Sequence, residues 1–451
     1  MAEDPHNRQQ VEPTIAVHPL NPNIIVAGAQ DLRLVGEPGH HNRWHGYYRS
    51  TDRGRTWSVS LLPGFPGDVS AEGRNSPLRF FDATTDPVLA MDRSGNAFYA
   101  GIAFNTDPVD DTPIGLSQKV FVAKYTGDGA TYDSAIVLDG TVYGTFHDKE
   151  WIAIDNSGGN NNGHVYLVWN AVTIEGVLTS IFASSTDHGA TFSLPTEVPD
   201  RTSAFAYIAV DQSSGRVYVA AMSQEFPFPI LVSRSDDGGT SFTTHEAPKP
   251  VGITGLPDND FRVGTLPVIA ADSIGVYLAW ADFSTGDADI LFSRSTDGGV
   301  TWSRPITIND DTTNHQFDPS ITASSGRLEL IWYDSRLDYG GKIAELDVYY
   351  AQSLDRGRSF LPNIRVTAES FDPNLVPRSV EPGASDPFIG DYIQLSSDGT
   401  SSHAIWADNT NADPLAEEDT GLLDQDVFTT RIAFCPAGIG IAAVRAAIFD
   451  C

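Results

Sequence analysis

One short phrase, built around a Ser, an Asp, a Gly and a Trp or Phe, occurs five times in this chain. The copies read RSTDRGRTWS, SSTDHGATFS, SRSDDGGTSF, SRSTDGGVTWS and AQSLDRGRSF, and they begin at Arg49, Ser184, Ser233, Ser293 and Ala351. Ser and Asp side chains can bond to nearby backbone N–H groups, and Gly permits a positive φ. We therefore expect a self-bonded hairpin at each copy, with its aromatic ring pinned between neighbouring units. Five copies cannot all be active sites, so the phrase predicts a repeated structural turn.

Short apolar segments precede each copy and recur where the phrase is absent. First strands are expected to begin near residues 12, 86, 149, 205, 265, 317 and 390, and each is followed by two further strands and a weaker fourth. Second strands such as VYLVW, VYLAW and LELIW are continuously apolar, as strands covered on both faces are. A four-stranded unit repeated seven times indicates a single all-β domain, a seven-bladed β-propeller of antiparallel blades over residues 1–451. A six-bladed ring is the alternative.

The last unit lacks an obvious fourth strand. The C-terminal segment 435–451, which contains IGIAAVRAAIF, could supply it, or the N-terminal stretch could close the ring instead. Cys435 and Cys451 bracket this segment, and a disulfide between them would indicate an extracellular setting. Two unpaired thiols are the alternative. The start, MAEDPHNRQQ, has no signal-peptide core, so for a secreted protein we expect the signal to have been removed already.

The charge balance limits the possible partners. The chain has 59 acidic and 28 basic residues, a net charge of −31, which repels nucleic acid and anionic membranes. The sequence contains no run of 18 apolar residues, so no segment is predicted to insert into a membrane. No cofactor is required, but structural Ca²⁺ could bind acidic loops such as PVDDTP (108–113) and NDDTTN (309–314). Such loops are also common as solvated turns.

The repeated phrase resembles the Asp-box, or BNR repeat, of the sialidase superfamily. Intact copies carry Asp52, Asp187, Asp237, Asp297 and Asp355, and a degenerate sixth, YTGDGATY at Tyr125–Tyr132, has Asp128 one place out of register. WYDSR, HDKEWIAID and IGDY also resemble secreted bacterial proteins called exo-sialidases. The resemblance implies a secreted, sialidase-like exo-glycosidase that acts on a glycan. It places the site opposite the Asp-boxes, on the loops that enter first strands and leave second strands.

Sialidase chemistry needs three arginines around the substrate carboxylate, a Tyr nucleophile with a Glu beside it, and an Asp acid/base. The candidates for catalysis are Tyr392, Tyr333, Glu150, Asp148 and His147. The candidates for substrate binding are Arg262, Arg336, Arg8, Asp334, Asp391 and His315, with Arg43, Arg201 and Arg378 as other possible third arginines. A wider ring of positions at the same strand ends includes Glu12, Asp86, Lys149 and Asp318.

Two departures from the sialidase pattern keep other functions open. QQVEPTIAV stands where an Arg-Ile-Pro motif is expected, and the repeats number seven where sialidases have six. A polysaccharide lyase acting on uronate glycans could use His147, His315, Tyr392, Arg262 and Arg336. A non-catalytic glycan-binding propeller could stack sugars on Trp44, Tyr333 or Tyr339. Structural roles are open as well: Asp334–Arg336 as an ion pair, His147–Asp148 as a turn cap, and Asp86 and Asp318 as braces before Pro.

Overall fold

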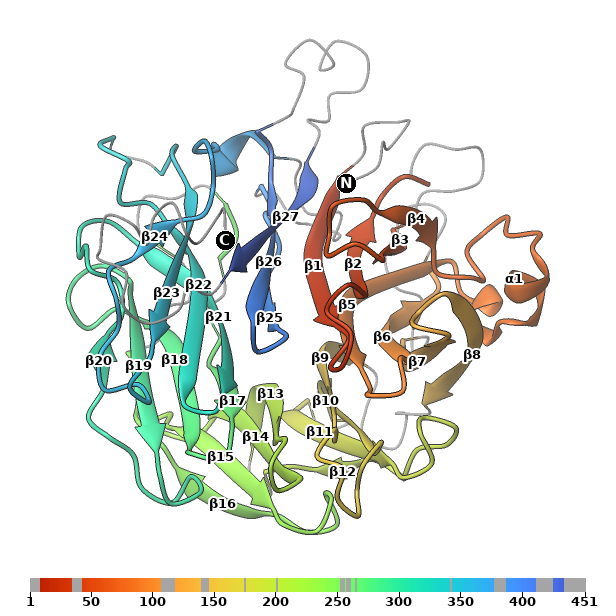
Figure 1. Cartoon of the computed structure of the whole chain (residues 1–451), viewed down its shortest axis with the longest axis horizontal. Helices are drawn as coiled ribbons and strands as arrows, with labels where there is room; N and C mark the ends of the chain where they lie inside the picture. Colours follow the sequence, from red (N-terminus) through yellow and green to blue (C-terminus); the bar gives the residue numbers. More distant parts are fainter. Residues whose placement is uncertain are drawn as a thin grey trace.

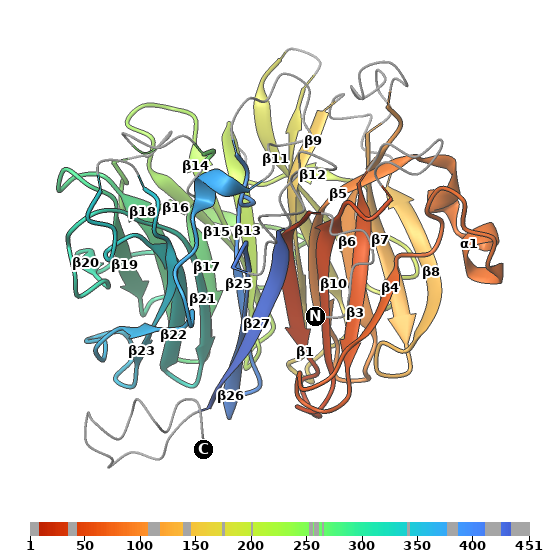
Figure 2. The ribbon, with the colours of Figure 1, turned by 90° about the horizontal axis from the view of Figure 1, so that it is seen from above.

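The chain forms seven separate antiparallel sheets arranged around one axis (Figure 1). The computed structural model describes residues 9–34, 43–106, 118–138, 146–173, 176–199, 202–251, 256, 261–263, 266–340, 343–376, 387–410 and 425–433. Seen from the side, the strands run roughly along the axis of the ring, so every blade presents loops to both faces (Figure 2). The seven-bladed prediction is confirmed, and the six-bladed alternative is wrong.

Each blade runs outward from the axis in chain order. The inner strands are β1 (Gln10–Val17), β5 (Ala83–Met91), β9 (Phe146–Ile154), β13 (Ser203–Asp211), β17 (Val268–Ala271), β21 (Gln316–Ser324) and β25 (Gln394–Ser397). The second strands are β2 (Ile25–Asp31), β6 (Ala97–Phe104), β10 (Val165–Val172), β14 (Arg216–Ser223), β18 (Val276–Asp282), β22 (Arg327–Asp334) and β26 (Ser401–Asp408). The third strands are β3 (Trp44–Ser50), β7 (Lys119–Thr126), β11 (Leu178–Ser185), β15 (Ile230–Ser235), β19 (Asp289–Ser295), β23 (Asp347–Ser353) and β27 (Asp426–Ala433). The outer strands are β4 (Ser58–Leu61), β8 (Thr131–Leu138), β12 (Thr196–Glu197), β16 (Thr243–Glu246), β20 (Ile306–Thr307) and β24 (Ile364–Arg365).

The second strands are buried along nearly their whole length, as their apolar sequences predict. Trp169, Trp280 and Trp332 of β10, β18 and β22 are 0–2% exposed, because each second strand is covered by neighbouring blades on both faces. Helices are few. A short helix α1 (Ala71–Asn75) and a 3₁₀ helix η1 (Pro77–Phe80) lie between β4 and β5, and η3 (Pro373–Leu375) follows β24. No helix in the described part of the chain is long and apolar enough to span a bilayer.

The first and last blades meet at a seam made by glutamines and apolar packing. The backbone N–H of Gln10 donates to Gln425 O at 2.6 Å, and Gln9 Nε2 donates to Gln425 Oε1 at 2.7 Å. Gln394 Oε1 accepts from Ile15 N at 2.6 Å. Blade seven has three strands among the described residues. The predicted closing segment 435–451 and the N-terminal stretch 1–8 lie outside those residues, as do both cysteines.

The repeated turns form between third and fourth strands and satisfy themselves internally. In the copy at Ser295, the Ser hydroxyl donates to Asp297 Oδ1 at 2.7 Å and accepts from Gly299 N at 2.8 Å. Asp297 also accepts from the backbone and the hydroxyl of Thr301, at 2.9 and 2.5 Å. The same Ser-to-Asp and Gly-to-Ser bonds occur in the other four copies. The predicted self-bonded turn is confirmed in all five.

The aromatic residue that ends each phrase packs on the preceding blade. Phe242 meets Phe182 edge-on with ring centroids 5.0 Å apart, and Phe360 meets Phe292 at 5.2 Å. The last Gly of the turn allows this approach, since a Cβ on Gly239 would lie 2.4 Å from the Phe182 ring. The turns therefore tie blades together, as expected, and they lie on the same face as the loops that join first to second strands.

Candidate functional site

The inner strands share an unusual backbone feature at the opposite face. Five of them are interrupted by a bulge, at which a non-glycine residue has a positive φ: Glu12 (55°), Asp86 (56°), Lys149 (54°), Phe205 (59°) and Asp318 (48°). A left-handed conformation at a non-glycine residue costs free energy, and such residues concentrate at functional sites. Four of the five bulge residues are ionisable, so the feature marks this end of the channel as the candidate site.

The bulges bring acidic and basic side chains together around the axis. We call this group the channel cluster, and its members are Glu12, Asp86, Asp148, Lys149, Glu150, Arg262, Asp318 and Asp391. The Lys149 ammonium pairs with Asp391 and lies 3.9 Å from Glu12 Oε1. The backbone N–H of Lys149 donates to Asp86 Oδ2 at 3.1 Å. Arg262 pairs with Asp391 from the other side, so residues of blades one, two, three and seven and of the loop before β17 meet in one ion-pair network.

Asp86 and Asp148 are neighbouring carboxyls whose pKa values are shifted in opposite directions. Burial raises the pKa of Asp148, and the hydrogen bond to Asp86 together with its charge raises it further. Burial alone would also raise the pKa of Asp86, but the Lys149 ammonium, the Lys149 N–H and the Asp148 carboxyl together lower it. These opposite directions favour the proton on Asp148 and the negative charge on Asp86. Opposite pKa shifts in two adjacent carboxyls are typical of an acid and its conjugate partner in catalysis.

Three further acids of the cluster, Glu12, Glu150 and Asp318, are buried and have carboxyl oxygens without a hydrogen-bond partner among the described residues. Burial is the main cause that raises the pKa of Glu12, Glu150 and Asp318, and the charges of Asp86 and Asp391 add to it. Their side chains are only 1–5% exposed. Glu12 Oε2 and both carboxyl oxygens of Glu150 and Asp318 have no hydrogen-bond partner. The raised pKa of each group favours its protonated form, which can both donate and accept a hydrogen bond.

Three aromatic rings lie next to the cluster. The Tyr392 hydroxyl donates to Pro87 O at 3.0 Å, and its ring packs edge-on against Trp151 with centroids 5.7 Å apart. Trp151 in turn contacts Tyr207 at 4.3 Å. Burial, followed by the charges of Glu12 and Asp86, raises the pKa of Tyr392, so this phenol stays protonated at neutral pH. The structure thus brings together Tyr392, Glu150 and Asp148 as predicted, but with the hydroxyl bonded to a carbonyl.

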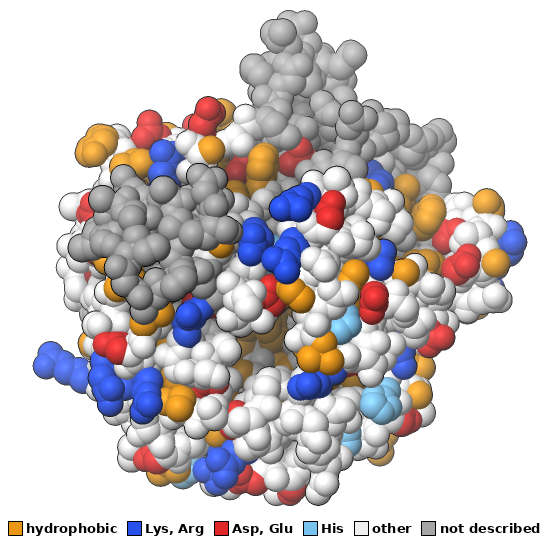
Figure 3. Space-filling view, viewed as in Figure 1, with side chains coloured by type: hydrophobic (Ala, Val, Ile, Leu, Met, Phe, Trp, Pro, Cys, Tyr) orange, Lys and Arg blue, Asp and Glu red, His pale blue; other side chains and the backbone are white. Residues whose placement is uncertain are grey.

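The rest of the channel contains a cavity of about 430 Å³. A hollow at the centre of the ring is visible in Figure 3. The C-terminal parts of the inner strands of all seven blades line this cavity, and Trp151 and Tyr207 are among the lining residues. No residue of the channel cluster lines this cavity. The aromatic rings therefore stand between the cavity and the cluster. The more exposed side of the cluster is that of Arg262, whose side chain is 35% exposed.

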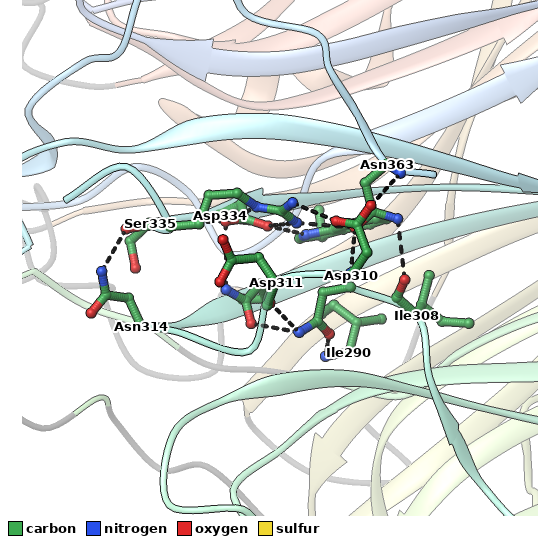
Figure 4. Close-up of polar contacts among 12 residues, drawn as sticks. Ile290, Ile308, Asp310, Asp311, Asn314, Asp334, Ser335 and Asn363 are labelled. Carbon is green, nitrogen blue, oxygen red and sulfur yellow. Dashed lines mark hydrogen bonds and ion pairs between the residues drawn. The ribbon is translucent and has the colours of Figure 1, made fainter. Parts of the chain in front are cut away.

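Arg336 and Asp334 lie in a different place, between blades five and six. Arg336 makes a two-pronged pair with Asp334, donating from Nε at 2.9 Å and from Nη2 at 2.7 Å, and it donates from Nη1 to Asp310 at 2.6 Å. The guanidinium also stacks over the Tyr349 ring at 3.9 Å. Asn363 and Asp310 exchange two further bonds in the same network (Figure 4). Arg336 is thus engaged in joining blades, and the structure does not bring it to the channel cluster.

The carboxylate of Asp334 belongs to a repeated structural pattern. It accepts from the indole N–H of Trp332 at 2.8 Å, and Asp282 and Asp408 accept from Trp280 and Trp406 at 3.1 and 2.7 Å. In all three cases the Asp stands two residues after the Trp at the end of a second strand. Recurrence in three successive blades indicates a brace for the strand end.

The other predicted residues are distributed over the ring. Tyr333 is fully buried and its hydroxyl exchanges bonds with Ala407 of the next blade, at 2.9 and 3.3 Å. His147 Nδ1 accepts from the Trp169 indole at 3.2 Å, and His315 Nδ1 accepts from Ala288 N at 3.1 Å. Arg8 lies outside the described residues.

Two further expectations can be compared with the structure. Trp44 is 0% exposed and donates to Leu62 O at 2.7 Å, so its ring is not available to stack on a sugar, whereas Tyr339 is 92% exposed.

In the loop NDDTTN, Asp310 bonds Arg336 and Asn363, and Asp311 accepts from Thr313 at 3.0 and 2.6 Å. The loop PVDDTP lies outside the described residues. Within the described ranges, no three His, Cys, Asp or Glu side chains are grouped so as to hold a metal ion.

The sequence pointed to the right strand ends but not to the residues that matter most there. Glu12, Asp86, Lys149 and Asp318 appeared only in the wider ring of positions. The signal was present in three dipeptides, Glu-Pro or Asp-Pro, at the same place in the first strand of units one, two and six. Trp151 and Tyr207 were missed. They occupy the position two residues after the bulge, where other blades have Thr14, Val88 or Ser320.

Comparison with known protein sequences gives one relative of low identity. No protein-family model matches the chain. A xyloglucanase of Paenibacillus sp is 28% identical over 264 residues, which cover 57% of this chain and 23% of that protein, so the match spans less than a quarter of the relative.

Similar solved structures include three named as sialidases or trans-sialidases. The Hadza microbial sialidase Hz136 has 15% identity over 73% of this chain and 64% of its own, with a TM-score of 0.48. The NanB sialidase from Streptococcus pneumoniae has 12% identity over 93% and 68%, with a TM-score of 0.43. The intramolecular trans-sialidase from Ruminococcus gnavus has 15% identity over 94% and 95%, also with a TM-score of 0.43.

Proposed function

We propose that this protein is a carbohydrate-active propeller that hydrolyses glycosidic bonds at the channel cluster. The observation that carries the proposal is the neighbouring pair Asp148 and Asp86 in the buried channel cluster, in which the pKa of Asp148 is raised and that of Asp86 is lowered. Glycosidic hydrolysis uses a carboxylic acid and a carboxylate on either side of the bond that breaks, about 5–9.5 Å apart, so the two carboxyls must separate as a glycan enters between them. The names of the xyloglucanase relative and of the sialidases give the same substrate class, a glycan.

The proposed steps follow from the protonation of the pair. Asp148 donates its proton to the oxygen of the leaving sugar as the C–O bond breaks, and Asp86 stabilises the positive charge that develops on the sugar ring. Water then adds to the sugar carbon and returns a proton to the pair. Lys149 and Arg262 hold Asp391 beside this pair and keep the network in place.

The finer prediction is a sialidase-like exo-glycosidase with Tyr392 as nucleophile, Glu150 beside it and Arg262 on the substrate carboxylate. Tyr392 and Glu150 are close enough for their charges to interact, which supports the pairing. The raised pKa of Tyr392 and the engagement of Arg262 with Asp391 favour direct use of the carboxyl pair instead. An extracellular location stays part of the proposal, and thiol titration of Cys435 and Cys451 under denaturing conditions tests it.

Mass spectrometry of products from a broad glycan panel, in H₂¹⁸O, tests the proposal. We expect products that are heavier by one water per cleaved bond and carry the label. Released sialic acid would establish the sialidase version. Unsaturated products without added water would indicate a lyase and contradict hydrolysis, and glycan retention without any product would leave a binding module.

A further inference from the structure

We propose that the cavity between the C-terminal parts of the inner strands, which we call the channel cavity, is a second binding site and takes a neutral sugar unit. Trp151 and Tyr207 separate this cavity from the channel cluster. The inference goes beyond the proposed function and does not depend on hydrolysis at the cluster. It rests on the shape of the cavity and on the polar groups in its lining that the protein leaves unused.

The channel cavity has the size of a ligand pocket and a path to solvent. Its volume of about 430 Å³ lies within the range of about 300–1,000 Å³ that is usual for small-molecule sites. At one level of the channel, the inner strands of blades one to five contribute alanine, for example Ala90 and Ala153, and so leave the space free. A second cavity of about 360 Å³ shares Pro19, Gln212 and Thr322 with it and continues toward the face of the repeated turns. A ligand can therefore enter from the face opposite the channel cluster.

Trp151 has an unused hydrogen-bond donor at the inner end of the cavity. Seven of the eight tryptophans in the sequence donate from the indole N–H to another group of the protein, among them Trp169, Trp280 and Trp332. Trp151 is the exception: its ring lines the cavity and is only partly buried, and its N–H has no partner among the described residues. Because the other tryptophans satisfy this group, the N–H of Trp151 indicates a donor that is available to a ligand.

The rings of Trp151 and Tyr207 form an aromatic wall on the side of blades three and four. Their centroids are 4.3 Å apart, and both rings line the cavity. The same strand position carries Val268, Ser320 or Gln394 in later blades, so the repeat itself does not require an aromatic ring there. An aromatic face of this kind packs well against a flat ligand with apolar C–H groups, such as a pyranose ring.

Blades six and seven place hydrogen-bonding groups across the axis from these rings (Figure 1). Gln394 Oε1 accepts from Thr14 Oγ1 at 2.8 Å and from Ile15 N at 2.6 Å, which fixes the amide and leaves its Nε2 without an acceptor among the described residues. The Thr322 hydroxyl lines the cavity and has no partner in the described part of the chain. Ser396 Oγ accepts a backbone N–H of blade one at 3.2 Å and keeps its own proton to donate. The cavity is therefore aromatic on one side and polar on the other.

The lining is also nearly free of charge. Among the described residues that line the channel cavity, Arg93 is the one with a charged side chain, and it lies near the mouth. Arg93 donates to Asn156 from its backbone N–H at 2.9 Å and from Nη1 at 3.1 Å. The lining thus offers uncharged donors and acceptors together with apolar rings. A neutral sugar unit, with C–H faces and a hydroxyl edge, matches this arrangement.

The indole signals of the tryptophans test this inference on the full chain. The protein is labelled with ¹⁵N at tryptophan, and Trp151→Phe identifies the signal of Trp151 in the NMR spectrum. The probes are methyl β-D-glucopyranoside, methyl β-D-xylopyranoside, cellobiose and lactose, each added to about 10 mM, where a millimolar dissociation constant is detected. We expect a saturable shift of the Trp151 indole N–H with at least one probe. The tryptophans at the repeated turns, Trp57 and Trp302, should not shift.

Two cavity variants and a matched control locate the bound sugar. Thr322→Val removes the hydroxyl and keeps the shape of the side chain, so it should weaken binding about three- to tenfold. Ala90→Leu extends a larger side chain into the cavity and should weaken binding at least about tenfold. Thr307→Val makes the same change as Thr322→Val on the exposed outer strand β20 and should leave binding unchanged. Because neither Thr side chain bonds to another described residue, both Val variants should keep the fold.

The outcomes separate this inference from the proposed hydrolysis. No shift of Trp151 with any probe, equal shifts of all tryptophans, or equal weakening by Thr322→Val and Thr307→Val would overturn it. A Trp151 shift that survives both cavity variants would place the sugar on the side of the channel cluster and would overturn it too. A shift that depends on the cavity, without any cleaved product, would uphold the inference while hydrolysis fails. Cleavage without such a shift would do the reverse.

Discussion

The two ends of the blades use the same kind of side chain in opposite ways. At one face, the carboxylates of Asp52, Asp187, Asp297 and Asp355 lie in exposed turns, and bonds from nearby hydroxyls and N–H groups lower their pKa to about 2. At the other face, Glu150 and Asp318 are buried without partners and their pKa is raised. An acid that satisfies itself in every blade stabilises the fold. Acids that differ between blades and remain unsatisfied point to a site for a ligand.

The largest effect should come from the acid–carboxylate pair. Asp148→Asn removes the proton donor without changing the size of the side chain, and we expect hydrolysis of the glycan substrate to fall by about 10²–10⁴-fold. Initial rates measured against product standards give the comparison. Asp297→Asn, at the other face, serves as the control and should change the rate less than twofold. A rate for Asp148→Asn within threefold of the unaltered protein would contradict the assignment.

Glu150 should make the stability of the protein depend on pH. Because its folded pKa is raised, the unaltered protein loses stability as pH rises above the ordinary range of a Glu and through the folded pKa. Glu150→Gln cannot ionise, so it should be more stable than the unaltered protein at pH 8 by about 1–3 kcal/mol and nearly equal at pH 4.5. Thermal melts at the two pH values measure this. If the stability advantage of Glu150→Gln over the unaltered protein were smaller at pH 8 than at pH 4.5, the predicted sign would be wrong.

Asp297 should behave in the opposite sense. Asp297→Ala removes the acceptor for Thr301 and Ser295 and should cost about 1–2 kcal/mol at neutral pH, with little effect on the rate. Since the folded pKa of Asp297 is lowered to about 2, this stabilisation is complete above the ordinary Asp pKa and is lost as pH falls toward 2. Chemical unfolding at pH 7 and pH 3 follows the difference between the two proteins. A difference that grows on acidification would be inconsistent with the lowered pKa.

The degenerate sixth turn sets the lower limit of the comparison. Among the described residues, the Asp128 side chain pairs with His18 Nε2 at 3.5 Å, and it is 46% exposed. Asp128→Ala should therefore change stability by no more than about 0.5 kcal/mol. Unfolding midpoints of this variant and of Asp297→Ala, measured side by side, test whether internal bonding rather than position explains the difference. Equal losses in the two variants would sink that explanation.

The repeat made the fold predictable, because strand patterns and the Ser-x-Asp-x-Gly turn depend on local sequence alone. The side chains of the turn residues Ser295, Asp297 and Thr301 bond to groups within a few residues of chain, so the local sequence is sufficient to predict the turn. WYDSR illustrates the limit of the same method. Its polar residues resembled a binding motif, yet Asp334 bonds Trp332 two residues away and Arg336 bridges to Asp310. A motif does not reveal which of its groups are already satisfied.

The channel cluster could be predicted only in part, because its contacts join distant segments. Lys149 meets Asp391 across 242 residues of chain, and Tyr392 meets Pro87 across 305. The positive φ at Glu12, Asp86 and Asp318 precedes a Pro, where sequence statistics favour extended backbone, so the bulge that turns these acids inward runs against the local preference. Tertiary packing overrides that preference, which no single strand reveals.

For protein engineering, the ring of bulges presents four interacting ionisable positions around one channel, so they are best varied together. Glu12, Asp86, Lys149 and Asp318 each come from a different blade, while the turns that tie the blades together lie at the far ends of those blades. A library that varies only these four residues would change the charge and shape of the channel mouth without touching a turn. The same scaffold could then be directed to new ligands.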